Sequence, residues 1–157
     1  ESVRHILDYA RALPEIAFLI MGSVGLALED EPLPENVRLL GEVDVPTRQA
    51  MLATADIALN PTFSGSGTNV KMLDYFGAGI PVVSTRFGAR GIEATDGIHA
   101  VLTDGEDFAD GLRTALAMSD EAAARMVVKA RRLVEERYSW ETIAERLNEV
   151  IVERWPG

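Results

Sequence analysis

The residues best suited to chemistry lie between Asn60 and Gly91, where two glycine-rich stretches flank a helical pattern and a short apolar run. The first stretch, Gly65-Ser-Gly-Thr68, leads directly into that helical pattern. Residues 57–92 carry three cations and one carboxylate, a local balance of +2, so the rest of this −10 chain carries −12. Glycine lets a ligand approach the main chain closely, and amides at a helix start attract anions. The segment therefore predicts a site for a small anionic ligand.

Two charged residues, Lys71 and Asp74, lie three apart on the expected helix and share part of one face. Lys71 could approach a phosphate, and an ionised Asp74 carboxylate could accept hydrogen bonds from two adjacent ribose hydroxyls. The same residues could instead form a surface ion pair worth less than about 1 kcal/mol. The local sequence leaves both interpretations open.

The loop matches neither of two common phosphate motifs. A P-loop would need its lysine at the helix start, and a dinucleotide fingerprint would need a third glycine where Val70 stands. A nucleotide-binding oxidoreductase domain therefore fits poorly as an alternative. A non-enzymatic receiver or interaction module is a second alternative, but Asp56 precedes its expected strand, whereas a receiver needs an aspartate at the strand's carboxyl end.

Short apolar runs alternate with helical patterns along the chain. The expected strands are 16–21, 37–40, 57–60, 81–85 and 99–102, and the expected helices are 3–13, 44–54, 68–78, 108–116, 126–134 and 140–151. On the helix at 68–78, the packed stripe is expected to be Val70, Leu73, Phe76 and Gly77. This alternation predicts an α/β fold, a Rossmann-like parallel sheet with helices on both faces. Ligands bind such sheets at the carboxyl ends of the strands, which includes the loops after Asn60 and Thr85.

Composition narrows the partners and cofactors. The 157 residues are most simply one domain, and the −10 charge argues against nucleic acid as a partner. The chain has no cysteine and no Asp-x-Asp motif, so no metal is expected. No apolar run is long enough for a transmembrane segment, and the expected compartment is cytoplasmic.

From Ser64 to Thr85 the sequence resembles the donor-binding segment of the GT-B glycosyltransferases of group 1, the large retaining group also called family 4. The stretch Asp74-Tyr-Phe-Gly-Ala-Gly-Ile-Pro-Val-Val-Ser-Thr85 is similar to the family's helix end, turn and strand, and Gly65–Lys71 resembles a subgroup with Gly-Ser-Gly-Thr-x-x-Lys. Similarities at Asn36–Gly41 and Ala55–Pro61 extend the resemblance along most of the chain. It implies the GT-B carboxyl-terminal half, with a nucleotide-diphosphate sugar as substrate and no other cofactor.

The resemblance also implies roles for residues. Two family glutamates bracket the donor; the second matches Asp74, implying ribose contact, whereas the first falls at the uncharged Ser66. Arg90 has no matched role and could equally make a structural bond in its loop. The residues taken as donor-binding are Gly65, Ser66, Gly67, Thr68, Asn69, Lys71, Asp74 and Arg90, and those taken as the base pocket are Gly22, Gly41 and Val43. The resemblance does not identify a catalytic residue.

The family's domain contains a first strand and a basic segment before the helix that begins here, and its enzymes carry an amino-terminal acceptor domain. We therefore expect residues 1–157 to be a single nucleotide-sugar-binding domain, a fragment of a longer two-domain glycosyltransferase that is inactive alone. The missing strand would be central, so we expect a gap or a repaired edge in the sheet, available to a second copy. The full-length protein is expected to be cytoplasmic, with a peripheral membrane association open to it.

Overall fold

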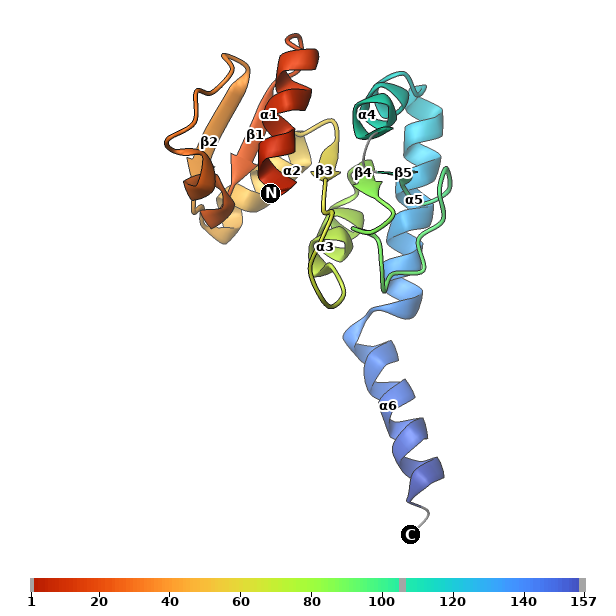
Figure 1. Ribbon diagram of the computed structural model, residues 1–157. Helices are drawn as coiled ribbons and strands as arrows, with labels where there is room; N and C mark the ends of the chain where they lie inside the picture. The colour runs from red at the N-terminus through yellow and green to blue at the C-terminus, as the bar shows by residue number, and fades with distance from the viewer. Residues whose placement is uncertain (1, 105–106, 156–157) are drawn as a thin grey trace.

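The computed structural model describes residues 2–104 and 107–155 and has the predicted order of strands and helices (Figure 1). The strands are β1 (Phe18–Met21), β2 (Val37–Gly41), β3 (Ala58–Asn60), β4 (Val82–Thr85) and β5 (Val101–Thr103). The helices are α1 (Ser2–Ala12), the 3-10 helix η1 (Ser23–Leu28), α2 (Val45–Thr54), α3 (Val70–Ala78), α4 (Phe108–Leu116), α5 (Asp120–Arg137) and α6 (Trp140–Arg154). Each α-helix and strand expected from the sequence is therefore present, with ends shifted by a few residues.

All of the strand pairs are parallel, as the alternation of strands and helices predicted. Side chains of successive residues in a strand point to opposite faces, and here both faces are covered. Val83 and Val101 belong to a core that includes residues of α1 and α4, whereas Val82 and Leu102 belong to a second core with residues of α3 and α5. The prediction of an α/β fold with helices on both faces is confirmed.

The predicted gap lies between β1 and β3. Strand β1 pairs with β2 in one sheet, and β3 is the edge of a second sheet ordered β3-β4-β5. The two sheets are separate in Figure 1. A groove of about 720 Å³ is lined by residues of both β1 and β3. Leu19, in the middle of β1, is 47% exposed, although a strand of a parallel sheet is normally buried on both faces. The domain thus presents two free strand edges to one groove.

The buried face of α3 differs from the predicted one. Met72 and Phe76 are buried, whereas Val70 is 61% exposed and Gly77 faces solvent. Val70 is the first residue of the helix, at the edge of the sheet, so little of the core lies beneath its side chain. The expected stripe was therefore wrong at Val70 and Gly77, although the helix itself was predicted correctly.

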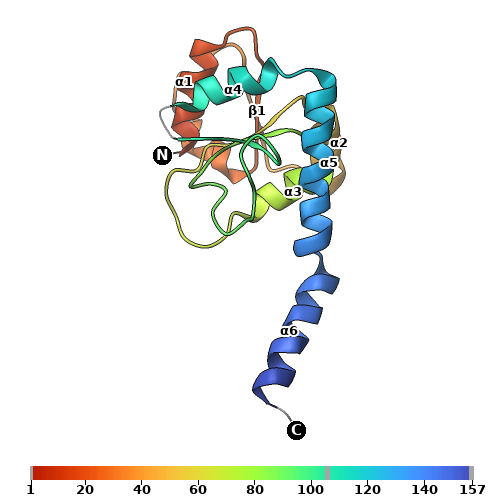
Figure 2. The same cartoon turned by 90° about the vertical axis from the view of Figure 1, so that its right-hand side faces the viewer.

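Helix α6 extends away from the rest of the chain, as two perpendicular views show (Figures 1 and 2). Its apolar positions, including Trp140 and Leu147, are largely exposed. The helical spacing predicted the helix, but the described chain provides no surface that buries this face. Among the described residues, no helix combines the length and apolar character needed to cross a bilayer.

We expect Gly111→Ala to destabilise the domain. Gly111 lies in α4 against β5, and an added Cβ would come within 2.2 Å of Thr103 Cγ2 and 3.5 Å of a Val83 methyl group. Threonine is β-branched and cannot easily move aside, so the overpacking should cost about 1–3 kcal/mol, visible as a lower midpoint of thermal unfolding.

Gly77→Ala is the matched control for this prediction. Gly77 is also inside a helix, but an added Cβ there meets nothing within 4 Å. Alanine favours helix by up to about 1 kcal/mol over glycine, so the control should raise the midpoint slightly. Equal shifts for the two variants would contradict the close packing of α4 on β5.

Candidate functional site

Two loops meet at the carboxyl ends of β3 and β4. The first loop comprises residues 61–69 between β3 and α3, and the second loop comprises residues 86–92 after β4. A Cβ added at Gly91 would lie 2.4 Å from Thr68 Oγ1, and one added at Gly88 would lie 2.7 Å from Asn60 Nδ2. The fold thus brings together the two glycine-rich stretches that stand apart in the sequence, and glycine is what permits their contact.

Backbone geometry also requires glycine at these loops. Gly67 has φ +74° and Gly91 has φ +76°, in the region that residues with a Cβ avoid. In the part of the chain that the structure describes, every residue with positive φ is a glycine. The backbone therefore requires glycine at both Gly67 and Gly91.

A buried polar side chain, Asn60, joins the two loops. It is 4% exposed, and its Nδ2 donates hydrogen bonds to Ser84 Oγ at 3.0 Å and to the Gly88 carbonyl at 3.1 Å. Its Oδ1 accepts hydrogen bonds from Thr62 Oγ1 at 2.8 Å and from Asn69 Nδ2 at 2.7 Å. The Asn60 amide thus uses all of its donors and acceptors in bonds to the two loops and to β4. A buried amide needs such partners because water cannot reach it.

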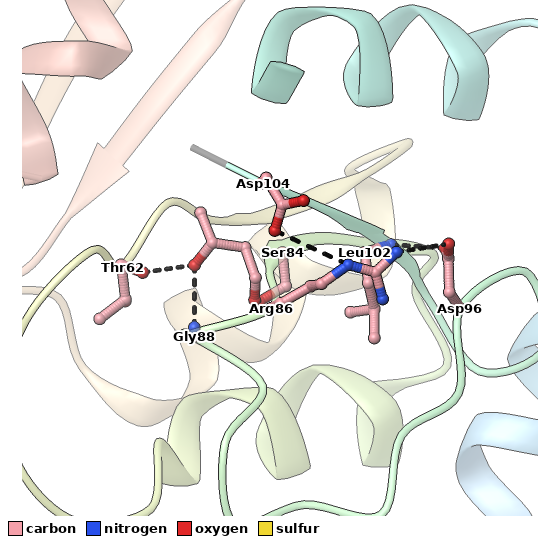
Figure 3. A network of polar contacts seen from close by, with 8 residues as sticks. Thr62, Ser84, Arg86, Gly88, Asp96, Leu102 and Asp104 are labelled. Atoms are coloured by element: carbon pink, nitrogen blue, oxygen red, sulfur yellow. Dashed lines mark hydrogen bonds and ion pairs between the residues drawn. The ribbon is translucent and has the colours of Figure 1, made fainter. Parts of the chain in front are cut away.

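A second link runs through a threonine hydroxyl at the end of β4. Thr85 Oγ1 donates to the Thr62 carbonyl and accepts from the Gly88 amide at 2.8 Å, the two contacts that join Thr62 and Gly88 in Figure 3. Sequence reasoning missed Asn60, Ser84 and Thr85 as part of the site. The sequence did contain a signal for these three residues, because each is a polar residue at the carboxyl end of an otherwise apolar strand.

The N-terminus of α3 carries no side-chain cap. Asn69 occupies the N-cap position, but its side chain makes no capping hydrogen bond, because Nδ2 donates to Asn60 Oδ1 and to Thr62 Oγ1. The Met72 amide donates to the Asn69 carbonyl at 3.1 Å, which leaves the amides of Val70 and Lys71 at the helix start. These amides and the positive end of the helix dipole favour an anion at this position. The first loop therefore has the geometry predicted for anion binding.

Two cations flank this helix start. Lys71 is exposed in the first turn of α3, and Arg90 Nη2 lies 3.5 Å from the position of a Cβ on Gly65. The Arg90 guanidinium also lies 4.0 Å above the Phe87 ring and donates to the Phe87 carbonyl. Within the described residues neither cation has a carboxylate partner within 4 Å, so their charge remains available to a ligand.

The other arginine of the second loop is neutralised. Arg86 forms ion pairs with Asp96 at 3.2 Å and Asp104 at 3.7 Å (Figure 3). Asp96 also accepts a hydrogen bond from the Leu102 amide at 2.8 Å. Arg86 therefore ties the second loop to the end of β5, and the local positive potential depends on Lys71 and Arg90.

Asp74 forms an ion pair with Arg48 of α2, with Nη1 and Oδ2 3.6 Å apart and both side chains about half exposed. The interpretation of Asp74 as the ion-pair partner of Lys71 is therefore wrong: the partner comes from a helix that packs alongside α3. An exposed pair of this length is weak, so the Asp74 carboxylate keeps acceptor sites for a ligand.

The residues taken as the base pocket lie at the ends of β1 and β2. The Gly22 amide donates to the Gly41 carbonyl at 2.6 Å, and Val43 follows two residues later with a half-buried side chain. The groove between the sheets is lined on one side by Met21 and on the other by Asn69 and Lys71. The end of β1 and the first loop therefore border the same groove, whereas Gly22, Gly41 and Val43 are not among the residues that line it.

Neither histidine is placed as a general acid or base for this site. His5 packs against Phe63 with ring centroids 4.7 Å apart, and His99 Nδ1 accepts the Thr95 amide at 2.9 Å. Partial burial, and then the charge of Lys129, lower the pKa of His99.

Among the described residues, no group of three or more His, Asp or Glu side chains is placed to hold a metal ion. Metal-independent binding stays a prediction.

A parallel α/β sheet with a glycine-rich loop and a helix start at the carboxyl ends of its strands is the arrangement of the doubly wound α/β class, whose ligands bind at that edge. Residues 1–118 match the family described as Glycosyl transferases group 1. The chain belongs to that family, as the carboxyl-terminal domain of its GT-B fold. The resemblance found from the first loop is thereby confirmed.

Curated relatives carry mannosyltransferase names. The chain is 28% identical over 153 residues to a phosphatidyl-myo-inositol mannosyltransferase of Mycolicibacterium smegmatis, a match that covers 87% of this chain and 36% of that protein. It is 32% identical over 106 residues to a chitobiosyldiphosphodolichol beta-mannosyltransferase of Debaryomyces hansenii, covering 59% of this chain and 22% of that protein. The chain spans at most about a third of the length of these relatives.

Solved structures share the fold. The crystal structure of Anabaena Alr3699/HepE in complex with UDP matches with a TM-score of 0.77 at 18% identity, over 97% of this chain and 45% of that chain. The structure of TarM matches with a TM-score of 0.74 at 22% identity, over 94% of this chain and 32% of that one.

Proposed function

We propose that this domain binds the nucleotide-diphosphate sugar donor of a retaining glycosyltransferase, and that the two loops hold the sugar and the diphosphate. The observation that carries the proposal is the uncapped N-terminus of α3, flanked by Lys71 and Arg90 at the ligand edge of the sheet. When the bond from sugar to diphosphate breaks, negative charge develops on the leaving group. Amides and cations already in place stabilise that charge without reorganising.

We propose a role for each residue of the candidate site. The amides of Gly67, Thr68 and Asn69 hold the sugar or the diphosphate, and Lys71 and Arg90 supply positive charge. Asp74 accepts the ribose hydroxyls, and the ends of β1 and β2 at Gly22, Gly41 and Val43 border the base. Gly65 and Ser66 shape the loop with a neutral side chain where the family has a glutamate, so we assign no catalytic carboxylate there.

The proposal is tested by ligand binding to the full-length protein. Calorimetry or saturation-transfer NMR would compare UDP-, GDP- and ADP-sugars with NAD. We expect one of the nucleotide sugars to bind and NAD not to bind. Binding of NAD alone would overturn the proposal in favour of the oxidoreductase alternative, and binding of none of the four would overturn it outright. Family membership already argues against the receiver alternative.

We further propose that the activity needs a longer protein, in which an acceptor domain and an additional strand complete the enzyme. The groove between β1 and β3 supports this, because it leaves two parallel strand edges unpaired in the described chain. That the isolated domain is inactive, and that the full-length protein is cytoplasmic and peripheral to a membrane, stay predictions.

We expect the isolated chain to self-associate through the groove. Free strand edges pair readily with other chains, and a charge pointing inward prevents such pairing. Leu19 lines the groove and is 47% exposed, so Leu19→Lys should shift the chain towards monomer. Light scattering over a concentration series measures the change.

Val128→Lys provides the control, because Val128 is 65% exposed on α5, which contributes no residue to the lining of the groove. It should leave self-association unchanged. A wild-type chain that stays monomeric at every concentration and unfolds in one cooperative transition would contradict pairing through the groove.

A further inference from the structure

We propose that Asn60 is a positioning residue: it holds the Asn69 side chain away from the N-terminus of α3 and so keeps the Lys71 amide open as a further donor to the anion bound by the amides of Gly67, Thr68 and Asn69. The inference rests on the proposed function, since it concerns the same helix start. It adds a reason why a buried amide joins the loops, which neither the family match nor the sequence motifs supply.

The first step concerns Asn69. Asparagine is among the best N-cap residues, because its side-chain oxygen accepts a hydrogen bond from the second or third helical amide. In this chain that bond is absent, and Asn69 Nδ2 instead donates to Asn60 Oδ1 at 2.7 Å and to Thr62 Oγ1 at 3.1 Å. The Met72 amide already donates to the Asn69 carbonyl at 3.1 Å. Released from these two acceptors, the Asn69 side chain could turn and occupy the Lys71 amide, the second amide of the helix.

The second step concerns the orientation of the Asn60 amide. Its Nδ2 faces the Gly88 carbonyl, an acceptor only, at 3.1 Å. Turning the amide over would place Oδ1 against that carbonyl, with two acceptors in contact and no proton between them. The second loop therefore determines that Oδ1 points to Asn69. The side chain is 4% exposed, so water offers little alternative partner.

The third step is that the second loop can approach only because residue 88 is glycine. A Cβ at that position would lie 2.7 Å from Asn60 Nδ2 and 2.8 Å from Ser84 Oγ. The chain of contacts thus runs from Gly88 to Asn60, then to Asn69, and then to the open helix start. Residues far apart in the sequence control whether one helix terminus is capped.

The test measures the affinity of the full-length protein for UDP, GDP and ADP by calorimetry, together with thermal unfolding. In Asn69→Asp the new carboxylate cannot donate to Asn60 Oδ1, and it becomes a charged cap at the positive end of α3. We expect the unfolding midpoint to stay or to rise, while affinity for the diphosphate that binds the wild type falls at least about tenfold. The new carboxylate also repels a diphosphate directly, so the Asn60→Asp variant, which leaves Asn69 unchanged, supplies the independent measurement.

One further variant tests the second step. Asn60→Asp places a carboxylate oxygen against the Gly88 carbonyl, and we expect lower stability together with an affinity loss of about tenfold.

The matched control is Asn36→Asp. Like Asn60, Asn36 is an asparagine whose amide bonds to distant segments. Its Nδ2 donates to the carbonyls of Ala10, Leu13 and Ile16, but it lies between α1 and β2. It should lower stability and leave affinity unchanged. Wild-type affinity in both Asn69→Asp and Asn60→Asp would overturn the positioning role alone. A wild type that binds none of the three nucleotides would overturn the proposed function, and this inference with it.

Discussion

Gly91→Ala in the full-length protein should abolish most nucleotide-sugar binding while the domain remains folded. Gly91 has φ +76°, and an added Cβ would lie 2.4 Å from Thr68 Oγ1 and 3.2 Å from Thr68 Cβ. Thr68 immediately precedes the N-cap of α3, so a shift here moves the amides proposed to hold the diphosphate. We expect at least about a tenfold loss of affinity, together with a stability cost of about 2 kcal/mol from the backbone and the collision.

Gly97→Ala separates the effect of backbone strain from the effect of the collision with Thr68. Gly97 has φ +70°, nearly the same as Gly91, but a Cβ there meets nothing within 4 Å. The control should lower stability through the backbone term of about 1–2 kcal/mol and leave affinity unchanged. The measurements are calorimetric titration with the nucleotide sugar and thermal unfolding of each variant. If the two variants lose the same affinity, the contact between the loops does not shape the site.

Asp74→Ala is expected to produce the second large effect. A carboxylate that accepts hydrogen bonds from two ribose hydroxyls makes charge-assisted contacts, each worth about 1.5–3 kcal/mol. Losing both contacts should weaken nucleotide-sugar binding at least about a hundredfold, as measured by calorimetry on the full-length protein.

The ion pair with Arg48 supplies the control that distinguishes a ligand contact from a structural one. Arg48→Met removes the 3.6 Å pair but keeps the Asp74 carboxylate, and an exposed pair contributes at most about 1 kcal/mol. Affinity should therefore change little in Arg48→Met, and as little in Glu141→Ala, which removes a carboxylate from α6. If Asp74→Ala and Arg48→Met lose equal affinity, Asp74 acts through α2 and does not contact the ribose.

The sequence predicted the elements well because their signals are local. The run from Ile16 to Met21 is apolar and too short for a helix, and it contains β1. Pro46 and Asp44 marked the start of α2, where the Asp44 side chain accepts a hydrogen bond from the Thr47 amide. The hydrogen bond to Thr47 lowers the pKa of Asp44. Alternation of such elements then specified a parallel sheet, with the first loop at its ligand edge.

Prediction failed where a residue's neighbours come from distant segments. Asn60 and Gly88 are 28 residues apart, yet the parallel pairing of β3 and β4 places them in contact. The sequence left open an ion pair between Asp74 and Lys71, its neighbour along the helix, whereas the packing of α2 beside α3 supplies Arg48 as the partner. Helical spacing likewise placed Val70 in a packed stripe, but the end of the sheet leaves it exposed.

By itself the sequence determined the order of the elements, the parallel sheet, the glycine positions and the position of the anion loop, because backbone preference and hydrophobic spacing act within a few residues. Only the tertiary structure decided that Asn69 does not cap α3 and that Arg90 lies beside Gly65. The physical reason is that side-chain hydrogen bonds and close contacts depend on which strand ends the sheet brings together. That arrangement is a property of the whole packed chain.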